Sequence, residues 1–216
     1  MIAVELLDKL GSDLTVVNAA RVSFAKQSDS FNESDERLIR YLAKHKHWTP
    51  FSQCQVQLRI AAPIFVARQA FKSSVGTSRN EISRRYVDEL PTYYNPQEWR
   101  SRPTNGMKQG SGEALSKAVN NKCSRIHVDI VALADEAYRK LLLLGAAPEQ
   151  ARMVLPQAMM TEWIETGSLA YWARFYGLRS SPDAQKEIQD LAEKVAAVIA
   201  PLFPISWKAL CASAKT

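Results

Sequence analysis

The feature that most constrains the fold is a strict alternation of polar and apolar residues over positions 53–60, QCQVQLRI. Successive side chains of a strand point to opposite faces of a sheet, so this pattern predicts a strand that is buried on one face only. Pro63 follows and suits the first turn of a helix, which we predict over 63–72, PIFVARQAFK. Local sequence therefore sets the order strand then helix here.

Strands and helices alternate along the rest of the chain. Further strands are predicted over 2–6 and 159–165, and helices over 16–23, 35–45, 113–144, around Arg152, 168–178 and 182–202. Ser34 is expected to cap the 35–45 helix, and Gly145 to close the long one. A few strands among long helices indicate an α+β fold, with a small, mostly antiparallel sheet and several long helices.

A polar segment interrupts this order at 91–111. It holds three prolines and two glycines, residues that break both helices and strands. We predict a mobile loop here, an insertion or a lid rather than a linker, inside one domain that spans residues 1–216.

Composition restricts the partners. The chain has 216 residues, of which 46% are hydrophobic, enough for one domain with its own core. Its 28 Lys and Arg exceed its 22 Asp and Glu, and a net charge of +6 favours an anionic partner. The three cysteines (Cys54, Cys123 and Cys211) form no CxxC pair, which argues against disulfides and structural zinc and for a reducing compartment. Without an export signal or an apolar span, we expect a cytoplasmic protein with no membrane partner.

Several common chemistries lack their defining motifs. The sequence has no GxxxxGK[ST], GxGxxG, HExxH or GxSxG, which argues against P-loop, Rossmann, zincin and hydrolase sites. His45 and His47 would point to different faces of a helix, and no cluster of cysteines or carboxylates completes a metal site, so we predict none. His47 remains a functional candidate, because it lies at a helix end next to Thr49 and Pro50.

Residues 71–86, FKSSVGTSRNEISRRY, are rich in basic residues and serines. A charged run of this kind is most often a solvated surface. In an extended segment, however, Glu81, Ser83 and Arg85 would project from one side, as an acceptor, a hydroxyl and a guanidinium. Such a triplet can bind the hydroxyls and the phosphate of a nucleotide, with bidentate contacts from the arginine.

Several ordered blocks resemble the flavin-dependent thymidylate synthases. They are GSDLTVVNAARVSF from Gly11, HWTPF from His47, APIFVARQ from Ala62, NEISRRY from Asn80, PEQARMVLP from Pro148 and LRSSPDAQKEI from Leu178. The resemblance covers most of the chain except the 91–111 loop and the helix after it. The chain also lacks the Pro-Cys nucleophile of the unrelated cysteine-dependent thymidylate synthases.

The resemblance implies a homotetramer that binds FAD, dUMP and methylenetetrahydrofolate at sites shared between subunits, with NADPH reducing the flavin. It implies that Arg179 is catalytic, because a cation at the uracil ring favours the electron-rich form that accepts the one-carbon unit at C5. It assigns dUMP binding to Gln69, Lys72, Glu81, Ser83, Arg84, Arg85, Arg152 and Arg179. It assigns FAD binding to His47, Thr49, Lys72, Ser73, Ser74, Glu81, Ser168 and Arg174, and it places Ser23 near the folate.

The chain departs from the family signature, which begins Arg-His-Arg and reaches its serine after seven residues. Here Lys72, Ser73 and Ser74 stand at that start, and Ser83 follows after eight residues. Gly76 is expected to absorb the additional residue, since glycine tolerates backbone conformations closed to others. Two extra arginines, Arg79 and Arg84, are expected to restore the local charge.

Two alternatives remain open. A related enzyme could use the same site to attach another C5 substituent to dUMP, such as a hydroxymethyl group. The chain could instead be a nucleotide-binding homologue that has lost catalysis. Binding to nucleic acid is disfavoured, because the basic residues lack the interleaved aromatic residues of a single-strand groove.

Overall fold

The computed structural model describes residues 1–86, 90–103 and 110–213. The alternating segment forms β2 (Gln55–Pro63), whose Val56, Leu58 and Ile60 are buried. β2 lies between β1 (Ala3–Leu10) and β4 (Met160–Ser168), and the short β3 (Thr77–Glu81) pairs with the far side of β4. All three pairings are antiparallel, which confirms the predicted small antiparallel sheet.

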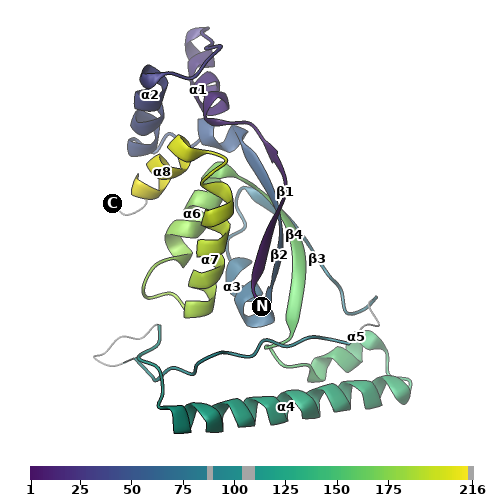
Figure 1. Cartoon of the computed structure of the whole chain (residues 1–216). Helices are drawn as coiled ribbons and strands as arrows, with labels where there is room; N and C mark the ends of the chain where they lie inside the picture. Colours follow the sequence, from purple (N-terminus) through teal and green to yellow (C-terminus); the bar gives the residue numbers. More distant parts are fainter. Residues whose placement is uncertain (87–89, 104–109, 214–216) are drawn as a thin grey trace.

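One face of the sheet carries the helices (Figure 1). α3 (Ile64–Ala70), α6 (Leu169–Arg179), α7 (Lys186–Ile199) and α8 (Pro204–Ser213) lie on this side. The core forms where the buried faces of α6 and α7 meet the apolar residues of β2 and β4, with Trp163 and Trp172 among its largest members. These elements form a single α+β domain, as the sequence predicted.

α1 (Asp13–Arg21) and α2 (Glu33–Lys44) lie together at one end of the sheet (Figure 1). The prediction that Ser34 caps α2 was wrong: the N-cap is Asn32, whose Oδ1 accepts the Ser34 N–H at 2.8 Å. Asp35 completes a capping box by accepting the Asn32 N–H at 3.0 Å, and it pairs with Arg21 of α1 at 2.5 Å. The Asp35 carboxylate therefore both caps the start of α2 and holds α2 against α1.

The predicted long helix is α4 (Lys117–Leu143), which lies at the opposite end of the sheet from α1 and α2 (Figure 1). Gly145, with φ +87°, follows its C-terminus as predicted. The helix begins four residues later than the pattern suggested, because residues 113–115 pair instead with 99–101: the Leu115 N–H donates to the Trp99 carbonyl at 2.8 Å. α5 (Pro148–Ala151) and the 3-10 turn η3 (Arg152–Val154) return the chain to β4.

Most of the predicted 91–111 loop that the structure describes is held by hydrogen bonds. The Tyr94 N–H donates to the Ala158 carbonyl at 2.8 Å, and Arg100 pairs with Glu187 of α7 at 2.6 Å. The middle of the predicted mobile loop, residues 104–109, lies outside the described residues.

The predicted 182–202 helix is shorter than expected, and α8 follows it unpredicted. The carboxylate of Asp13 accepts the N–H groups of Ile205 at 3.0 Å and Ser206 at 2.9 Å. The Asp13 side chain thus accepts hydrogen bonds from backbone N–H groups in the first turn of α8, which would otherwise lack partners. The two segments lie at opposite ends of the sequence. In the described part of the chain, no helix has the length and apolar character needed to cross a membrane.

Candidate functional site

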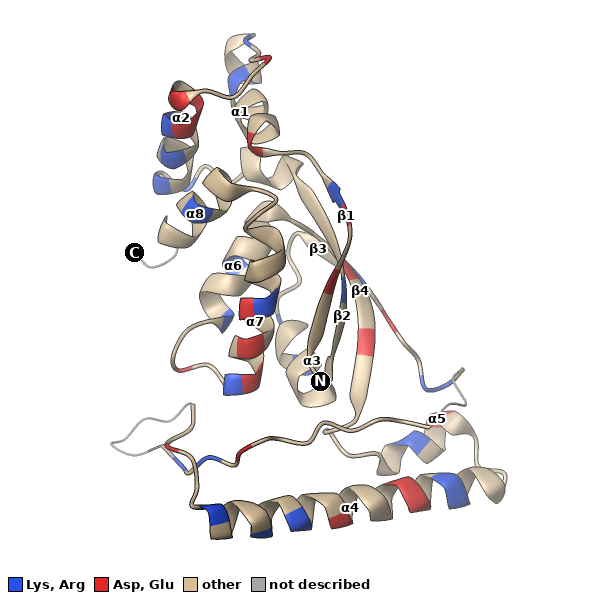
Figure 2. Ribbon diagram, in the orientation of Figure 1, with Lys and Arg blue, Asp and Glu red and all other residues tan. Residues whose placement is uncertain are grey.

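A basic groove lies where β3 ends beside α3 and η3. It has a volume of about 730 Å³, and its wall includes Arg68, Arg84, Arg85 and Arg152 together with Glu81 and Ser83. The basic segments after β3 and after α5 lie at the same end of the molecule (Figure 2). Five of the predicted nucleotide residues (Glu81, Ser83, Arg84, Arg85 and Arg152) therefore share one groove, although they come from segments far apart in the sequence.

The chain turns inside this groove, which corrects the expectation of an extended segment through Arg85. β3 ends at Glu81, and the Tyr86 N–H donates to the Ser83 carbonyl at 3.0 Å to close a turn. The turn still keeps the residues together, because the Arg85 Nε lies 3.4 Å from the Ser83 Oγ, and the Arg85 guanidinium lies 5.0 Å from the centre of the Tyr86 ring.

Glu81 supplies the carboxylate of the basic groove. Its Oε1 accepts a hydrogen bond from the Thr161 Oγ1 at 2.6 Å, which orients it from the neighbouring strand. An oriented carboxylate among guanidinium groups can accept hydrogen bonds from a ligand's hydroxyl or N–H groups while the arginines bind its phosphate.

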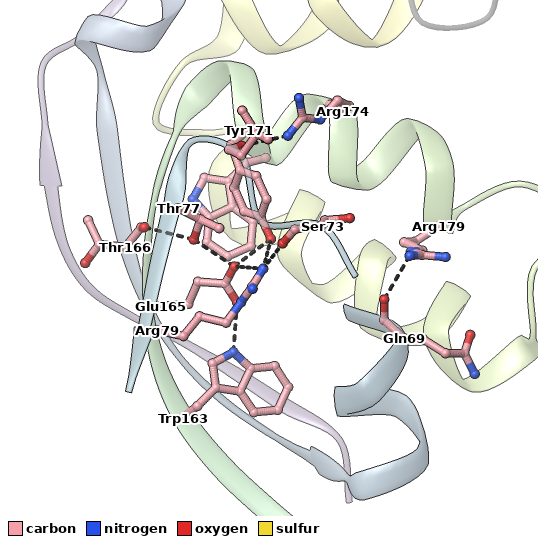
Figure 3. A network of polar contacts seen from close by, with 12 residues as sticks. Gln69, Ser73, Thr77, Arg79, Trp163, Glu165, Thr166, Tyr171, Arg174 and Arg179 are labelled. Atoms are coloured by element: carbon pink, nitrogen blue, oxygen red, sulfur yellow. Dashed lines mark hydrogen bonds and ion pairs between the residues drawn. The ribbon is translucent and has the colours of Figure 1, made fainter. Parts of the chain in front are cut away.

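Arg179 and Gln69 lie together but do not line the basic groove. Arg179 is the last residue of α6, and α7 begins only at Lys186. Its Nη2 donates to the Gln69 carbonyl at the end of α3 at 2.8 Å, as Figure 3 shows. The Arg179 Nε is buried and has no hydrogen-bond partner among the described residues.

A second site, the α6 cavity, lies between the end of α2, the 71–76 loop and α6. It has a volume of about 600 Å³, and its wall is largely apolar, with Leu42, Phe51 and Tyr171 among its residues. Three predicted flavin residues line it: His47, Ser168 and Arg174.

Backbone groups of the 71–76 loop are fixed beside this cavity. The Arg174 Nη2 donates to the Val75 carbonyl at 2.6 Å, and the Ser168 N–H donates to the Gly76 carbonyl at 3.0 Å. Val75 and Gly76 both line the cavity. Gly76 has φ +86°, in agreement with the expectation that a glycine absorbs the extra residue here.

A third cavity, of about 1340 Å³, adjoins the second. It contains Ser23 and Thr49, the predicted folate and flavin neighbours, and it shares Leu42, Lys46, His47 and Trp48 with the α6 cavity. Phe24 and Trp48, which are exposed in the single chain, also line it. The end of α2 and the segment that follows it therefore form a wall common to both cavities.

The remaining predicted residues lie elsewhere. Lys72 and Ser74 are exposed and Ser73 is buried, and none of the three lines the basic groove or either cavity. Glu81, which was assigned to both ligands, lines only the basic groove among these three sites.

The expectation that Arg79 restores the positive charge of the ligand site was wrong, because Arg79 does not line the basic groove. Its Nη2 lies 2.9 Å from the Glu165 Oε1 inside the sheet, and only 14% of its side chain is exposed. Burial alone would lower the pKa of the Arg79 guanidinium, but the hydrogen bond and charge of Glu165 outweigh it and raise the pKa. Of the two extra arginines, only Arg84 lines the basic groove.

Sequence reasoning missed three residues at these sites. Arg68 lines the basic groove, and Lys46 and Trp48 line both cavities. The signal was present in the quoted motifs, because Arg68 precedes Gln69 in APIFVARQ and Trp48 follows His47 in HWTPF. Lys46 has φ +58°, an uncommon conformation for a residue other than glycine.

Comparison with known proteins gives consistent matches. The family model described as "Thymidylate synthase complementing protein" matches residues 5–205. A flavin-dependent thymidylate synthase from Thermus thermophilus is 35% identical over 206 residues, which is 95% of this chain and 74% of that protein. One from Thermosipho melanesiensis is 36% identical over 203 residues, which is 94% of this chain and 87% of that protein.

A solved structure is also similar. The UMP/dUMP methylase PolB from Streptomyces cacaoi, bound with 5-Br dUMP, superposes with a TM-score of 0.89 at 30% identity, covering 100% of this chain and 97% of that one. The match extends over the sheet, the helices and the segments that carry the basic groove and both cavities. The chain therefore belongs to the thymidylate synthase complementing protein family, whose relatives include the flavin-dependent thymidylate synthases.

Proposed function

We propose that this protein is a flavin-dependent thymidylate synthase, which methylates dUMP at C5 to give dTMP. The observation that carries the proposal is the basic groove, where Glu81, Ser83 and three of its four arginines coincide with the positions that the family resemblance assigns to dUMP. Methylenetetrahydrofolate is the one-carbon donor, FAD the cofactor and NADPH the reductant. The free cysteines of the described chain are consistent with a reducing cytoplasm.

The chemistry of the groove suits a nucleoside monophosphate. One guanidinium group can donate two parallel hydrogen bonds to phosphate oxygens. The Arg85 and Arg152 side chains lie at the protein surface, where they can make such contacts. The Glu81 carboxylate, oriented by Thr161, accepts hydrogen bonds from hydroxyl or N–H groups of the nucleotide.

The α6 cavity fits a flavin. Its apolar walls suit a planar ring system, and Lys46, His47 and Arg174 provide positive or polar groups for a pyrophosphate. A Cβ added at Gly76 would lie 3.3 Å from the Ser168 Oγ and 3.4 Å from the Tyr171 Cβ, so the loop lies as close to α6 as a glycine allows. When bound, the flavin supplies the reducing equivalents that turn the transferred one-carbon unit into a methyl group.

Arg179 and Gln69 suggest that the site is shared between subunits. Within one chain neither of them lines the basic groove, although Gln69 directly follows Arg68, which does. If Arg179 contacts the uracil ring, it reaches a nucleotide held by the groove of a neighbouring subunit. This geometry supports the expected homotetramer.

The surface of α4 supports the same assembly. Val119, Ile126, Ile130 and Leu133 recur at intervals of seven, four and three residues and therefore form one stripe on the helix, and each is at least 44% exposed. An exposed apolar stripe on a long helix marks a surface that another chain covers. A second copy of this chain is its proposed occupant.

The stripe gives a test of the assembly. The wild-type protein is expected to be a tetramer in light scattering at micromolar concentration. A Leu133→Glu variant would place a charge in the buried interface and is expected to yield smaller species, whereas Asn121→Glu, an exposed position outside the stripe, should leave the tetramer intact. A monomeric wild-type protein would contradict the proposed assembly.

The activity has a direct test. Purified protein with FAD, NADPH, methylenetetrahydrofolate and dUMP is expected to give a product whose mass is that of dTMP. A hydroxymethyl product would instead identify the related C5-modifying activity, and no product from flavin-loaded protein would favour the inactive homologue. UMP run beside dUMP tests whether the chain shares the substrate range named for PolB.

A further inference from the structure

We propose that Arg79 is a positioning residue for the flavin, which acts by holding the backbone of the 71–76 loop as one wall of the α6 cavity. This inference rests on the proposed function, because that function supplies the ligand of the cavity. It concerns the segment where the chain departs from its family signature, Lys72, Ser73 and Ser74 in place of Arg-His-Arg.

The first observation is that one nitrogen joins the loop to the sheet. The Arg79 Nη2 donates to the Ser73 carbonyl, approaches the Glu165 Oε1 at 2.9 Å and the Tyr171 hydroxyl oxygen at 2.8 Å (Figure 3). Its guanidinium also lies 5.1 Å from the centre of the Phe71 ring, at the start of the loop. Arg79 therefore connects the loop to both β4 and α6.

The second observation is that Glu165 holds Arg79 in place. The Glu165 side chain is 2% exposed and accepts hydrogen bonds from Tyr171 at 2.5 Å, Thr77 at 2.9 Å and Trp163 at 2.8 Å. A carboxylate bound by so many donors has little freedom. The cation that it pairs with is therefore fixed, and so is the Ser73 carbonyl.

The third observation is that the loop is held at three successive points. Arg79 binds the Ser73 carbonyl, Arg174 binds the Val75 carbonyl and the Ser168 N–H binds the Gly76 carbonyl. Val75 and Gly76 line the α6 cavity, and so do two of the three anchoring residues, Ser168 and Arg174. Arg79, which is only partly exposed, fixes the loop at Ser73, two residues before the part of the loop that lines the cavity.

The test is a charge-neutral double variant, Arg79→Met with Glu165→Gln. It removes the donor to the Ser73 carbonyl without leaving a buried charge unpaired, and the glutamine oxygen can still accept from Thr77 and Tyr171. The matched control is Arg59→Met with Glu162→Gln, an exposed arginine–glutamate pair on the same sheet with 3.8 Å between its charged groups. A single Arg79→Lys variant retains a cation at the site.

Two measurements are made on each protein. Amide hydrogen exchange over residues 71–76 reports the loop directly and needs no flavin, and quenching of FAD fluorescence reports binding. We expect the double variant to exchange faster in this segment and to bind FAD roughly tenfold to a hundredfold more weakly, as expected for a lost charged hydrogen bond. The control should match the wild type in both, and Arg79→Lys should recover most of the affinity.

Unchanged exchange in the double variant would overturn the inference, and so would faster exchange with wild-type FAD affinity. An equal loss of affinity in the control would also overturn it, since the effect would then not belong to Arg79. Failure of the wild-type protein to bind FAD would instead overturn the proposed function, and the inference with it, whatever the exchange data show.

Discussion

An Arg179→Ala variant is expected to lose about a hundredfold in the rate of methyl transfer, with a much smaller change in the binding of dUMP. Negative charge develops on the uracil ring only as the one-carbon unit is transferred, so a cation assigned to the ring stabilises the transition state more than the ground state. The buried, unpartnered Nε of Arg179 is consistent with a guanidinium that has donors left for a ligand.

Arg85 provides the contrast. It lines the basic groove and is assigned to phosphate, an interaction that is present equally before and during the reaction. Arg85→Ala should therefore mainly raise the KM for dUMP. Steady-state kinetics with saturating NADPH and methylenetetrahydrofolate separate the two effects, with Arg37→Ala on the exposed side of α2 as the control. If both variants kept the wild-type kcat and KM, neither arginine would belong to the dUMP site. If Arg85→Ala lowered mainly kcat and Arg179→Ala raised mainly KM, the roles assigned to the two arginines would be wrong.

A Glu165→Ala variant is expected to lower the free energy of unfolding by about 3–5 kcal/mol. The substitution leaves the mostly buried Arg79 without its carboxylate, and it removes the acceptor of Tyr171, Thr77 and Trp163. Removing one partner of a buried ion pair is far more destabilising than removing both, because the remaining charge has no compensation.

Urea unfolding monitored by tryptophan fluorescence measures this loss. The matched control is Glu162→Ala, three residues earlier on β4, where the carboxylate is 54% exposed and lies 3.8 Å from Arg59. An exposed pair of this kind contributes less than about 1 kcal/mol. Equal losses in the two variants would show that the Arg79–Glu165 pair has no special part in stability.

The spacing of apolar residues in the sequence correctly predicted strands and helices that have one apolar face. The alternating pattern of β2 and the long helix α4 were both found close to their predicted positions, because each pattern repeats over many residues. The boundaries were less accurate where a distant residue decides them. The N-cap of α2 is Asn32, whose capping partner Asp35 also docks on α1, and α8 begins where Asp13 caps it.

For the candidate site, too, the sequence predicted some features and the tertiary structure decided others. The sequence identified the residue types and, through the ordered family motifs, the positions that line the basic groove. It did not separate Arg79 from Arg84, which are five residues apart in one basic run. The structure buries the first against Glu165 and leaves the second in the groove.

What the sequence by itself determined is the α+β class, the family and a basic surface near β3, because these depend on local pattern and on motif order. What only the tertiary structure decided is which of these charges face a ligand. The carboxylate that pairs with Arg79 comes from β4, 86 residues further along the chain, and no local pattern encodes that pairing. Folding brings the Glu165 carboxylate to Arg79 and so withdraws that charge from the basic groove.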